Sequence, residues 1–277
     1  MTCKYSLLLL LSINTGVVLL SATASLADDH HQQPSKPRPS LDLANEVVKA
    51  GYWYAPSHFL PANINCSLFT HLFAAFAYVN DSTYQVYFPT GYEEPFQNFP
   101  ETCINSSVKI LLSIGGNDSD PSIFAAMASN HSSREAFINS SIRVAMTYNY
   151  SGLSLNWQYP NSSDQMADLG LLLTEWRAAV EKQGVPLHLT ADVFYSSVYQ
   201  GFEYPIQNIT ASLDWINVMA YDLYTPSISS SANLTRPPAP LYNFGDQANV
   251  SVDYGVRASW KDAGAWLNHC LFIYLLF

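Results

Sequence analysis

Six short, almost continuously apolar runs alternate with longer amphipathic stretches from residue 48 onward, and this pattern constrains the fold more than any other feature. The runs are rich in Val, Ile, Leu and Phe, which is typical of parallel strands buried on both faces. They cover residues 48–54, 70–78, 108–114, 152–157, 187–194 and 215–221.

The stretches between these runs predict helices over 122–127, 133–148 and 164–183. In the last of them, Leu169, Leu172, Leu173, Trp176 and Val180 recur at helical spacing. Alternating strands and helices predict an α/β fold with a parallel sheet, and the 277 residues suffice for one barrel of roughly 250 residues. We favour a TIM-type (β/α)8 barrel, with a doubly wound open sheet as the alternative.

Short motifs close four of the predicted strands. The first run ends in G-Y-W-Y (51–54) and the second contains F-A-A-F (73–76). The third ends in S-I-G-G (113–116) and the sixth in M-A-Y-D (219–222). In a (β/α)8 barrel the functional site lies at the carboxyl ends of the strands, so these motifs mark one common site.

The fourth run, S-G-L-S-L-N-W-Q-Y-P (151–160), carries the decisive resemblance. It resembles the strand-four signature D-G-[LF]-D-[LF]-D-W-E-Y-P of glycoside hydrolase family 18, the chitinases. The other motifs match this family in the same order, and the phrases over 69–73 and 213–222 resemble plant class V chitinases in particular. The resemblance runs from about Lys49 to Trp266.

All four acidic positions of that signature are replaced, by Ser151, Ser154, Asn156 and Gln158. The resemblance implies a retaining, substrate-assisted mechanism in which the sugar's own acetamide attacks the anomeric carbon. The proton donor of that mechanism falls on Gln158, and the Asp that orients the acetamide falls on Asn156. Because neither amide can transfer a proton near neutral pH or carry a negative charge, we predict no intact catalytic residue and an inactive protein.

Another carboxylate could in principle replace the lost acids. Asp192 lies on the fifth run, where related plant enzymes tend to carry Ala. It either faces the barrel interior or is a hydrogen-bonded polar group within the strand or against a helix, and we favour the second placement. The resemblance also makes Tyr221 and Asp222 partners of the acetamide group.

Several side chains are expected to line a cleft and bind N-acetylglucosamine units, largely by stacking of rings. Ordinary barrel core is the alternative for each ring, above all for Trp53 and Phe76. The candidate substrate-binding residues are Tyr52, Phe76, Trp157, Tyr159, Tyr195, Met219, Tyr221 and Asp222.

The first residues are typical of a secretory signal peptide. Lys4 precedes an apolar stretch of about 14 residues, which is short of the roughly 20 needed to span a bilayer, and S-L-A (25–27) is a small-residue cleavage site. We therefore predict a signal peptide over 1–27, cleaved after Ala24 or Ala27, with no membrane span after its removal. We predict a secreted protein, in the extracellular space, the vacuole or elsewhere in the secretory pathway.

N-glycosylation sequons are frequent, which favours the same compartment. They begin at Asn65, Asn80, Asn105, Asn117, Asn130, Asn139, Asn149, Asn161, Asn208, Asn233 and Asn249. After signal removal three cysteines remain, Cys66, Cys103 and Cys270, and Cys66 could pair with Cys103. No spacing of Cys or His suggests a metal site, and we expect no cofactor. A formal net charge of −10 argues against nucleic acid as a partner.

The domain prediction follows from these segments. We expect a disordered leader over 28–46, an incomplete family-18 barrel over 47–266, truncated after about six β/α units, and an apolar tail over 267–277. We interpret that tail as the product of a truncated or mispredicted reading frame, with a buried strand or helix as the alternative. Six strands cannot close an eight-stranded barrel, so we expect an open, C-shaped sheet with unpaired edges and the tail against the gap.

Three functions stay open at this point. The leading hypothesis is a secreted, catalytically inactive chitinase-like protein that binds chitin or N-acetylglucosamine oligomers, in a plant defence or signalling setting implied only by the resemblance. The second is an active endochitinase that hydrolyses β-1,4-linked N-acetylglucosamine polymers with an unrecognised acid. The third is a non-functional product of a degenerate gene.

Overall fold

The computed structural model describes residues 5–13, 16–24, 48–57, 59–184, 186–224, 237–243, 249–265, 270–272 and 275–276. The predicted leader over 28–46 and the sequon at Asn233 lie outside these residues. In the part of the chain so described, no helix has the length and apolar character of a membrane span.

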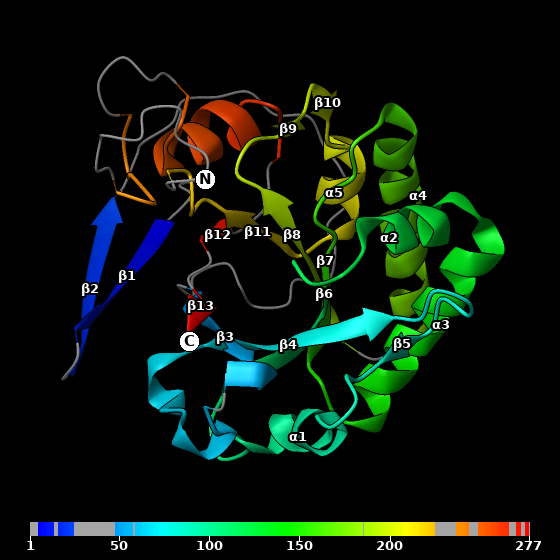
Figure 1. The fold of residues 1–277 in the computed structure, drawn as a ribbon, viewed down its shortest axis with the longest axis horizontal. Coiled ribbons are helices and arrows are strands. Elements are labelled where there is room, and N and C mark those ends of the chain that lie inside the picture. The colour runs from blue at the N-terminus through cyan, green and yellow to red at the C-terminus, as the bar shows by residue number, and fades with distance from the viewer. Residues whose placement is uncertain are drawn as a thin grey trace.

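A curved parallel sheet forms the centre of the molecule, with the helices along its outer side (Figure 1). Each of the six predicted apolar runs forms a strand of this sheet, which confirms the TIM-barrel-like α/β fold. The strands are β3 (Ala50–Tyr54), β4 (His71–Val79), β6 (Lys109–Gly115), β7 (Gly152–Asn156), β8 (His188–Phe194) and β11 (Trp215–Met219). They lie side by side in chain order, as consecutive β/α units do.

The helices begin and end where local capping groups allow. Asp120, Asn130 and Ser162 each accept a backbone N–H at the start of a helix, and Gly184 ends one in the left-handed conformation. The α-helices are α1 (Glu93–Asn98), α2 (Pro121–Ser129), α3 (His131–Thr147), α4 (Ser163–Gln183) and α5 (Ile206–Ser212). Short 3-10 turns are η1 (Ala55–Ser57), η2 (Pro61–Asn63), η3 (Cys66–Leu68) and η4 (Phe99–Glu101), and η5 (Tyr254–Lys261) is a π-helical segment.

Short strands decorate the sheet. β5 (Val86–Tyr87) pairs with the end of β4, and β9 (Val198–Tyr199) pairs with β10 (Phe202–Glu203). The predicted signal segment forms an antiparallel hairpin of β1 (Tyr5–Ile13) and β2 (Gly16–Ala24), which lies at the left of the view, on the opposite side from α2 to α5 (Figure 1). Its removal as a signal peptide stays a prediction.

The apolar tail pairs with both edges of the central sheet. β12 (Cys270–Phe272) runs parallel to β11, and β13 (Leu275–Leu276) runs parallel to β3. The prediction that the tail lies against the gap is confirmed, whereas the prediction of unpaired edges at β3 and β11 is wrong. Backbone N–H and C=O groups at an exposed edge are ready to pair with any extended segment, and the tail supplies two.

Alternation along each strand divides the core into two layers. On the outer face, side chains such as Leu112, Leu153 and Val193 pack against the helices in the larger apolar cluster. On the inner face, Tyr52 and Phe73 belong to a smaller cluster. We call this smaller set the inner cluster; it comprises Val48, Tyr52, Phe73, Ala75, Leu111, Trp215 and Met219.

Two covalent or ionic links tie the outer elements together. Cys66 and Cys103 form a disulfide, one of the pairings that the sequence leaves open. On the outer layer, the guanidinium of Arg134 on α3 donates to both carboxylate oxygens of Glu175 on α4 and to the carbonyl of Ala128. Such a fork-shaped pair fixes the relative orientation of two neighbouring helices.

Helix α4 offers a matched test of the outer core, because two adjacent leucines differ only in exposure. Leu172 is 0% exposed and Leu171 is 49% exposed. We expect Leu172→Ala to lower the free energy of unfolding by about 2–5 kcal/mol, since it removes buried methyl groups and leaves a cavity. Leu171→Ala should change it by about 0.5 kcal/mol or less. Urea unfolding of both variants checks this, and equal effects would contradict the assigned register of α4.

Candidate functional site

The signature strand β7 directs its replaced acidic positions toward the inner face of the sheet. Ser154 and Asn156 are buried there, and Gln158 follows at the carboxyl end of the strand, half-buried. Leu153 and Leu155 alternate with them and face the helices. Ser151 lies before the strand, where its carbonyl accepts from the backbone N–H of His188, so it is at the other end of the sheet.

Trp157 does not reach the inner face. It is 2% exposed and stacks on Phe124 of α2 at a centroid distance of 6.1 Å. Its place follows from alternation, because it shares the parity of Leu153 and Leu155 rather than that of Gln158. The structure thus differs from the expectation that its ring is available to a sugar.

Asp192 on β8 faces the inner side of the sheet, contrary to the placement that the sequence favours. Its side chain is 4% exposed, and its Oδ1 accepts from the Tyr52 hydroxyl at 2.7 Å and from Asn217 Nδ2 at 2.6 Å. Oδ2 accepts from Asn156 Nδ2, and the Ser154 hydroxyl lies 3.4 Å from Oδ1. Donors from three other strands therefore converge on this one carboxylate.

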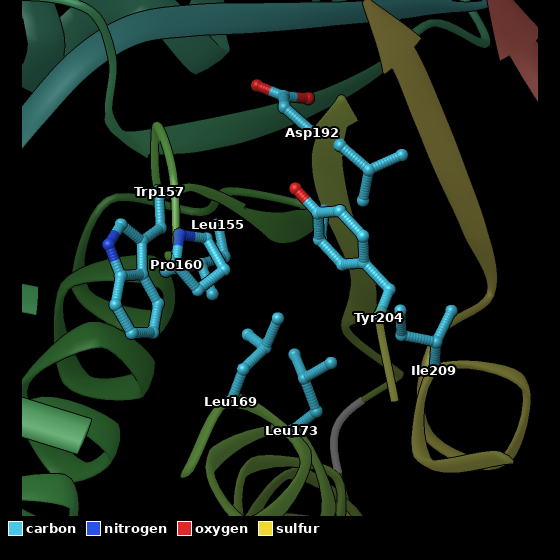
Figure 2. A pocket seen from close by; sticks show the side chains of 10 residues that line it. Leu155, Trp157, Pro160, Leu169, Leu173, Asp192, Tyr204 and Ile209 are labelled. Carbon is cyan, nitrogen blue, oxygen red and sulfur yellow. The ribbon is translucent and has the colours of Figure 1, made fainter. Parts of the chain in front are cut away.

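The opposite side of β8 is apolar. A small void of about 10 Å³ lies between the sheet and helices α4 and α5, lined by Leu169, Leu173, Tyr204 and Ile209 among others. Figure 2 shows the Asp192 carboxylate pointing away from these apolar side chains. The void has about the volume of one water molecule at most, so it is a packing gap rather than a ligand site.

Trp215 holds the side-chain amide of Asn217, on the same strand β11, in one orientation. The indole Nε1 of Trp215, which can only donate, gives its proton to Asn217 Oδ1 at 3.0 Å. The amide nitrogen of Asn217 is thereby turned toward Asp192 and the Tyr52 hydroxyl. Tyr52 itself stacks on Phe73 at 4.5 Å, which fixes its ring.

Gln158 is joined to this buried group through Asn156. Its Nε2 donates to Asn156 Oδ1 at 2.8 Å, and Nε2 also lies 3.6 Å from the sulfur of Met219. Asn156 in turn donates to Asp192. The two amides that replace the acids of the signature thus form a continuous chain down to the carboxylate.

Burial raises the pKa of Asp192 from 3.8 to about 6, although the hydrogen bonds from Tyr52 and Asn217 lower it. The pKa of Tyr52 is also raised, first by burial and then by the neighbouring charge of Asp192. Burial likewise raises the pKa of Tyr159 and of Tyr221 above the ordinary value. At neutral pH these phenols are hydrogen-bond donors, and Asp192 is ionised in most molecules.

The remaining candidate residues gather at the same end of the sheet, at different depths. Phe76, Tyr159 and Tyr221 are half-buried and pack against the inner cluster, to which Tyr52 and Met219 belong.

Two candidates lie farther out. The hydroxyl of Tyr195 donates to the carbonyl of Asn249 at 3.2 Å. Asp222 is exposed and has a positive φ of 53°.

The S-I-G-G motif shapes the neighbouring wall. Gly115 has a φ of +118°, and a Cβ atom there would lie 2.1 Å from the carbonyl oxygen of Asn156. Gly116 also has positive φ and faces the ring of Phe76, and its N–H donates to that same carbonyl at 2.9 Å. Glycine is required because the backbone at the end of β6 approaches the signature strand too closely for a side chain.

Most sequon asparagines of the described chain are exposed. Asn80 and Asn208 are half-buried, and the exposed ones are Asn65, Asn105, Asn117, Asn130, Asn139, Asn149, Asn161 and Asn249. Asn161 directly follows the signature, next to the candidate site. Among the residues whose structure is described, no group of three or more His, Cys, Asp or Glu is placed to hold a metal ion.

A family model described as "Glycosyl hydrolases family 18" matches residues 48–271. The chain belongs to this family. The matched segment contains every strand from β3 to β11, and it agrees with the resemblance carried by the motifs. Within the family signature, Gln158 occupies the position of the Glu and Asn156 that of the Asp two residues earlier.

Plant chitinases are prominent among the relatives. The chain is 47% identical over 229 residues to a class V chitinase of Arabidopsis thaliana, covering 80% of this chain and 59% of that protein. A solved class V chitinase from Nicotiana tobaccum, with one glutamate replaced by glutamine and in complex with NAG4, is 38% identical with a TM-score of 0.77. The match covers 82% of this chain and 66% of that one.

A second solved structure is that of a chitinase-like agglutinin from Robinia pseudoacacia. It is 41% identical with a TM-score of 0.73, covering 79% of this chain and 66% of that one. The chain thus spans less than two thirds of each of these relatives.

The raised pKa of Asp192 predicts a pH-dependent stability. Between pH about 4 and about 6 the folded family-18 chain binds more protons than the unfolded chain, so stability falls as pH rises through this window. A shift of about two units corresponds to about 3 kcal/mol. We expect Asp192→Asn, which cannot ionise, to gain about this much relative to wild type between pH 4 and 7. Urea unfolding of both proteins at both pH values measures it, and a pH-independent difference would contradict it.

Proposed function

We propose that this family-18 chain binds chitin-type oligosaccharides without hydrolysing them. The observation that carries the proposal is the state of Gln158. It stands at the position of the family's proton donor, and its Nε2 donates to Asn156 and faces the sulfur of Met219. A carboxamide supplies no proton for transfer near neutral pH, and loss of a general acid alone costs roughly 10²–10⁴ in rate.

Asp192 does not restore the missing acid. Both its oxygens already accept hydrogen bonds from side chains of the inner face, and Asn156 separates it from Gln158. A general acid must come within hydrogen-bond reach of the oxygen that it protonates, directly or through one water. With 4% exposure, Asp192 is too deep to meet that requirement. This supports inactivity over the alternative of an endochitinase with an unrecognised acid.

Ring surfaces and uncharged polar groups at the site favour sugar binding. Phe76, Tyr159 and Tyr221 are half-buried around the carboxyl ends of the strands, where apolar faces of sugar rings can stack on them. Two solved relatives agree with sugar recognition. One is a glutamate-to-glutamine mutant in complex with NAG4, and the other is an agglutinin.

Calorimetric titration with chitotetraose tests the proposal together with product analysis. We expect measurable binding and no shortened oligomers after prolonged incubation. Tyr221→Ala should weaken binding about tenfold through loss of a ring face. Tyr148→Ala is the matched control, because Tyr148 follows α3, which leads into the amino end of β7, away from the site. It should bind as wild type does.

Each contrary outcome selects another function. Release of shorter oligomers would establish an endochitinase. Absence of binding, with a cooperatively folded protein, would favour the non-functional product of a degenerate gene.

We also propose that the protein is secreted and N-glycosylated, with a role in plant defence or signalling that rests on the family resemblance alone. The apolar segment over 7–20, the exposure of most described sequon asparagines and the Cys66–Cys103 disulfide support the first two parts. Disulfides persist in oxidising compartments such as the secretory pathway.

Expression in a plant or other eukaryotic secretory host tests this localisation. We expect a protein in the medium that begins after Ala24 or Ala27 and that loses mass on treatment with an N-glycosidase. Replacing Lys4 and the apolar stretch with a polar sequence should retain the protein in the cell. An intact amino terminus on unmodified protein would contradict the proposal.

A further inference from the structure

We propose that Asp192 is a positioning residue that turns Gln158 so that its carboxamide oxygen, rather than its nitrogen, meets the ligand. The site then selects a ligand group that donates a hydrogen bond. The inference rests on the proposed binding of chitin-type oligosaccharides and adds the polarity of the contact at Gln158. It concerns a residue that lies outside the family signature, on the neighbouring strand β8.

Asp192, Asn156 and Gln158 form a series of hydrogen bonds, and the direction of donation along this series is set at its buried end, Asp192. An ionised carboxylate only accepts hydrogen bonds, so every group against Asp192 must present a donor. Tyr52 and Asn217 do so at Oδ1. Asn217 cannot turn over, since its own oxygen accepts from the indole of Trp215, which has no acceptor to offer instead.

The same requirement acts on Asn156. Its nitrogen faces Asp192 Oδ2, and its oxygen is therefore turned toward Gln158. Gln158 must therefore donate from its nitrogen, and its Nε2 lies 2.8 Å from Asn156 Oδ1. Each amide has one donating and one accepting end, so the orientation imposed by the carboxylate passes unchanged through both side chains.

At the outer end of this hydrogen-bonded series, Gln158 presents an acceptor atom. The two protons of Gln158 Nε2 are directed at Asn156 Oδ1 and, more weakly, at the sulfur of Met219. Gln158 Oε1 has no hydrogen-bond partner among the described residues, and the side chain is half-buried. Oε1 is therefore the atom that a ligand meets.

This polarity restricts what the site can recognise. A sugar hydroxyl or the N–H of an acetamide can donate to Oε1, whereas a glycosidic oxygen can only accept and finds no donor on Gln158. A Glu that protonates the glycosidic oxygen must present the opposite polarity. The arrangement thus favours a sugar docked by a hydroxyl or an acetamide N–H against Gln158.

The isosteric change Asp192→Asn tests the inference because it reverses the direction of hydrogen-bond donation between Asp192, Asn156 and Gln158. Asn at this position keeps an oxygen for Tyr52 and Asn217, but places an amide nitrogen against Asn156. Two facing donors force Asn156 to turn over, and Gln158 must then follow and present its nitrogen outward. We expect affinity for chitotetraose to fall about tenfold, with a cooperative unfolding transition retained.

A second change should restore the original direction. In the double variant Asp192→Asn with Asn156→Asp, the new carboxylate accepts from the new amide on one side and from Gln158 on the other. Gln158 is again held with its oxygen outward, so affinity should return to within about twofold of wild type. If Asp192 only supported the fold, moving its negative charge to position 156, the next side chain in the hydrogen-bonded series, would not restore affinity.

A spectroscopic reading judges the orientation without any ligand. In protein labelled with ¹⁵N-glutamine, both Nε2 protons of Gln158 should exchange slowly with solvent, because both are engaged. In Asp192→Asn they should exchange at least about tenfold faster, and the double variant should regain protection. The wild-type spectrum decides the matter even if a variant fails to fold.

The two proposals fail in different ways. If wild type does not bind chitotetraose but its Gln158 protons are protected, the proposed function fails and the orientation stands. If wild type binds and its Gln158 protons exchange freely, the inference about Asp192 is overturned. Equal affinity of wild type and Asp192→Asn would overturn it as well.

Discussion

The buried carboxylate of Asp192 is the constraint on which the inner face of the sheet depends. A charge at this depth is tolerated only where donors surround it, and Tyr52, Asn156 and Asn217 supply them from three different strands. Two of the replaced acidic positions, Ser154 and Asn156, lie directly beside this carboxylate. Aspartates at 154 and 156 would stand within hydrogen-bond distance of Asp192, and three carboxylates cannot all ionise there. The uncharged side chains at 154 and 156 therefore let Asp192 ionise without a like charge beside it.

Much of the fold could be predicted because its elements are written in local patterns. Strands buried on both faces are largely apolar, and the amphipathic repeat over 164–183 matches α4 (Ser163–Gln183) almost residue for residue. The short strands β5, β9 and β10 are too brief to leave such a pattern. The pairing of the tail with β3 and β11 could not be predicted either, because it depends on two edges that only the folded sheet brings within reach.

The site was harder to predict than the fold, because motif letters do not say which way a side chain points. The signature predicts Trp157 as a ligand contact, yet alternation from Gln158 places it on the outer face with Phe124. The same rule finds Asp192: on β8, Leu189, Ala191 and Val193 face the helices, so the residues between them face inward. What alternation cannot supply is the direction of each amide, which depends on contacts between strands distant in sequence.

Several sequon asparagines stabilise local backbone structure through their side-chain oxygens. The side-chain oxygens of Asn65, Asn80 and Asn130 each accept a backbone N–H two residues ahead, at a turn or a helix start. A sugar is attached through the other end of the amide, the nitrogen. A glycan at one of these sequons would therefore leave the oxygen that makes the turn or helix cap free to keep its hydrogen bond. Replacement by Asp would keep the oxygen that accepts this hydrogen bond and would remove the proposed attachment atom, whereas Gln would lengthen the side chain and alter the cap.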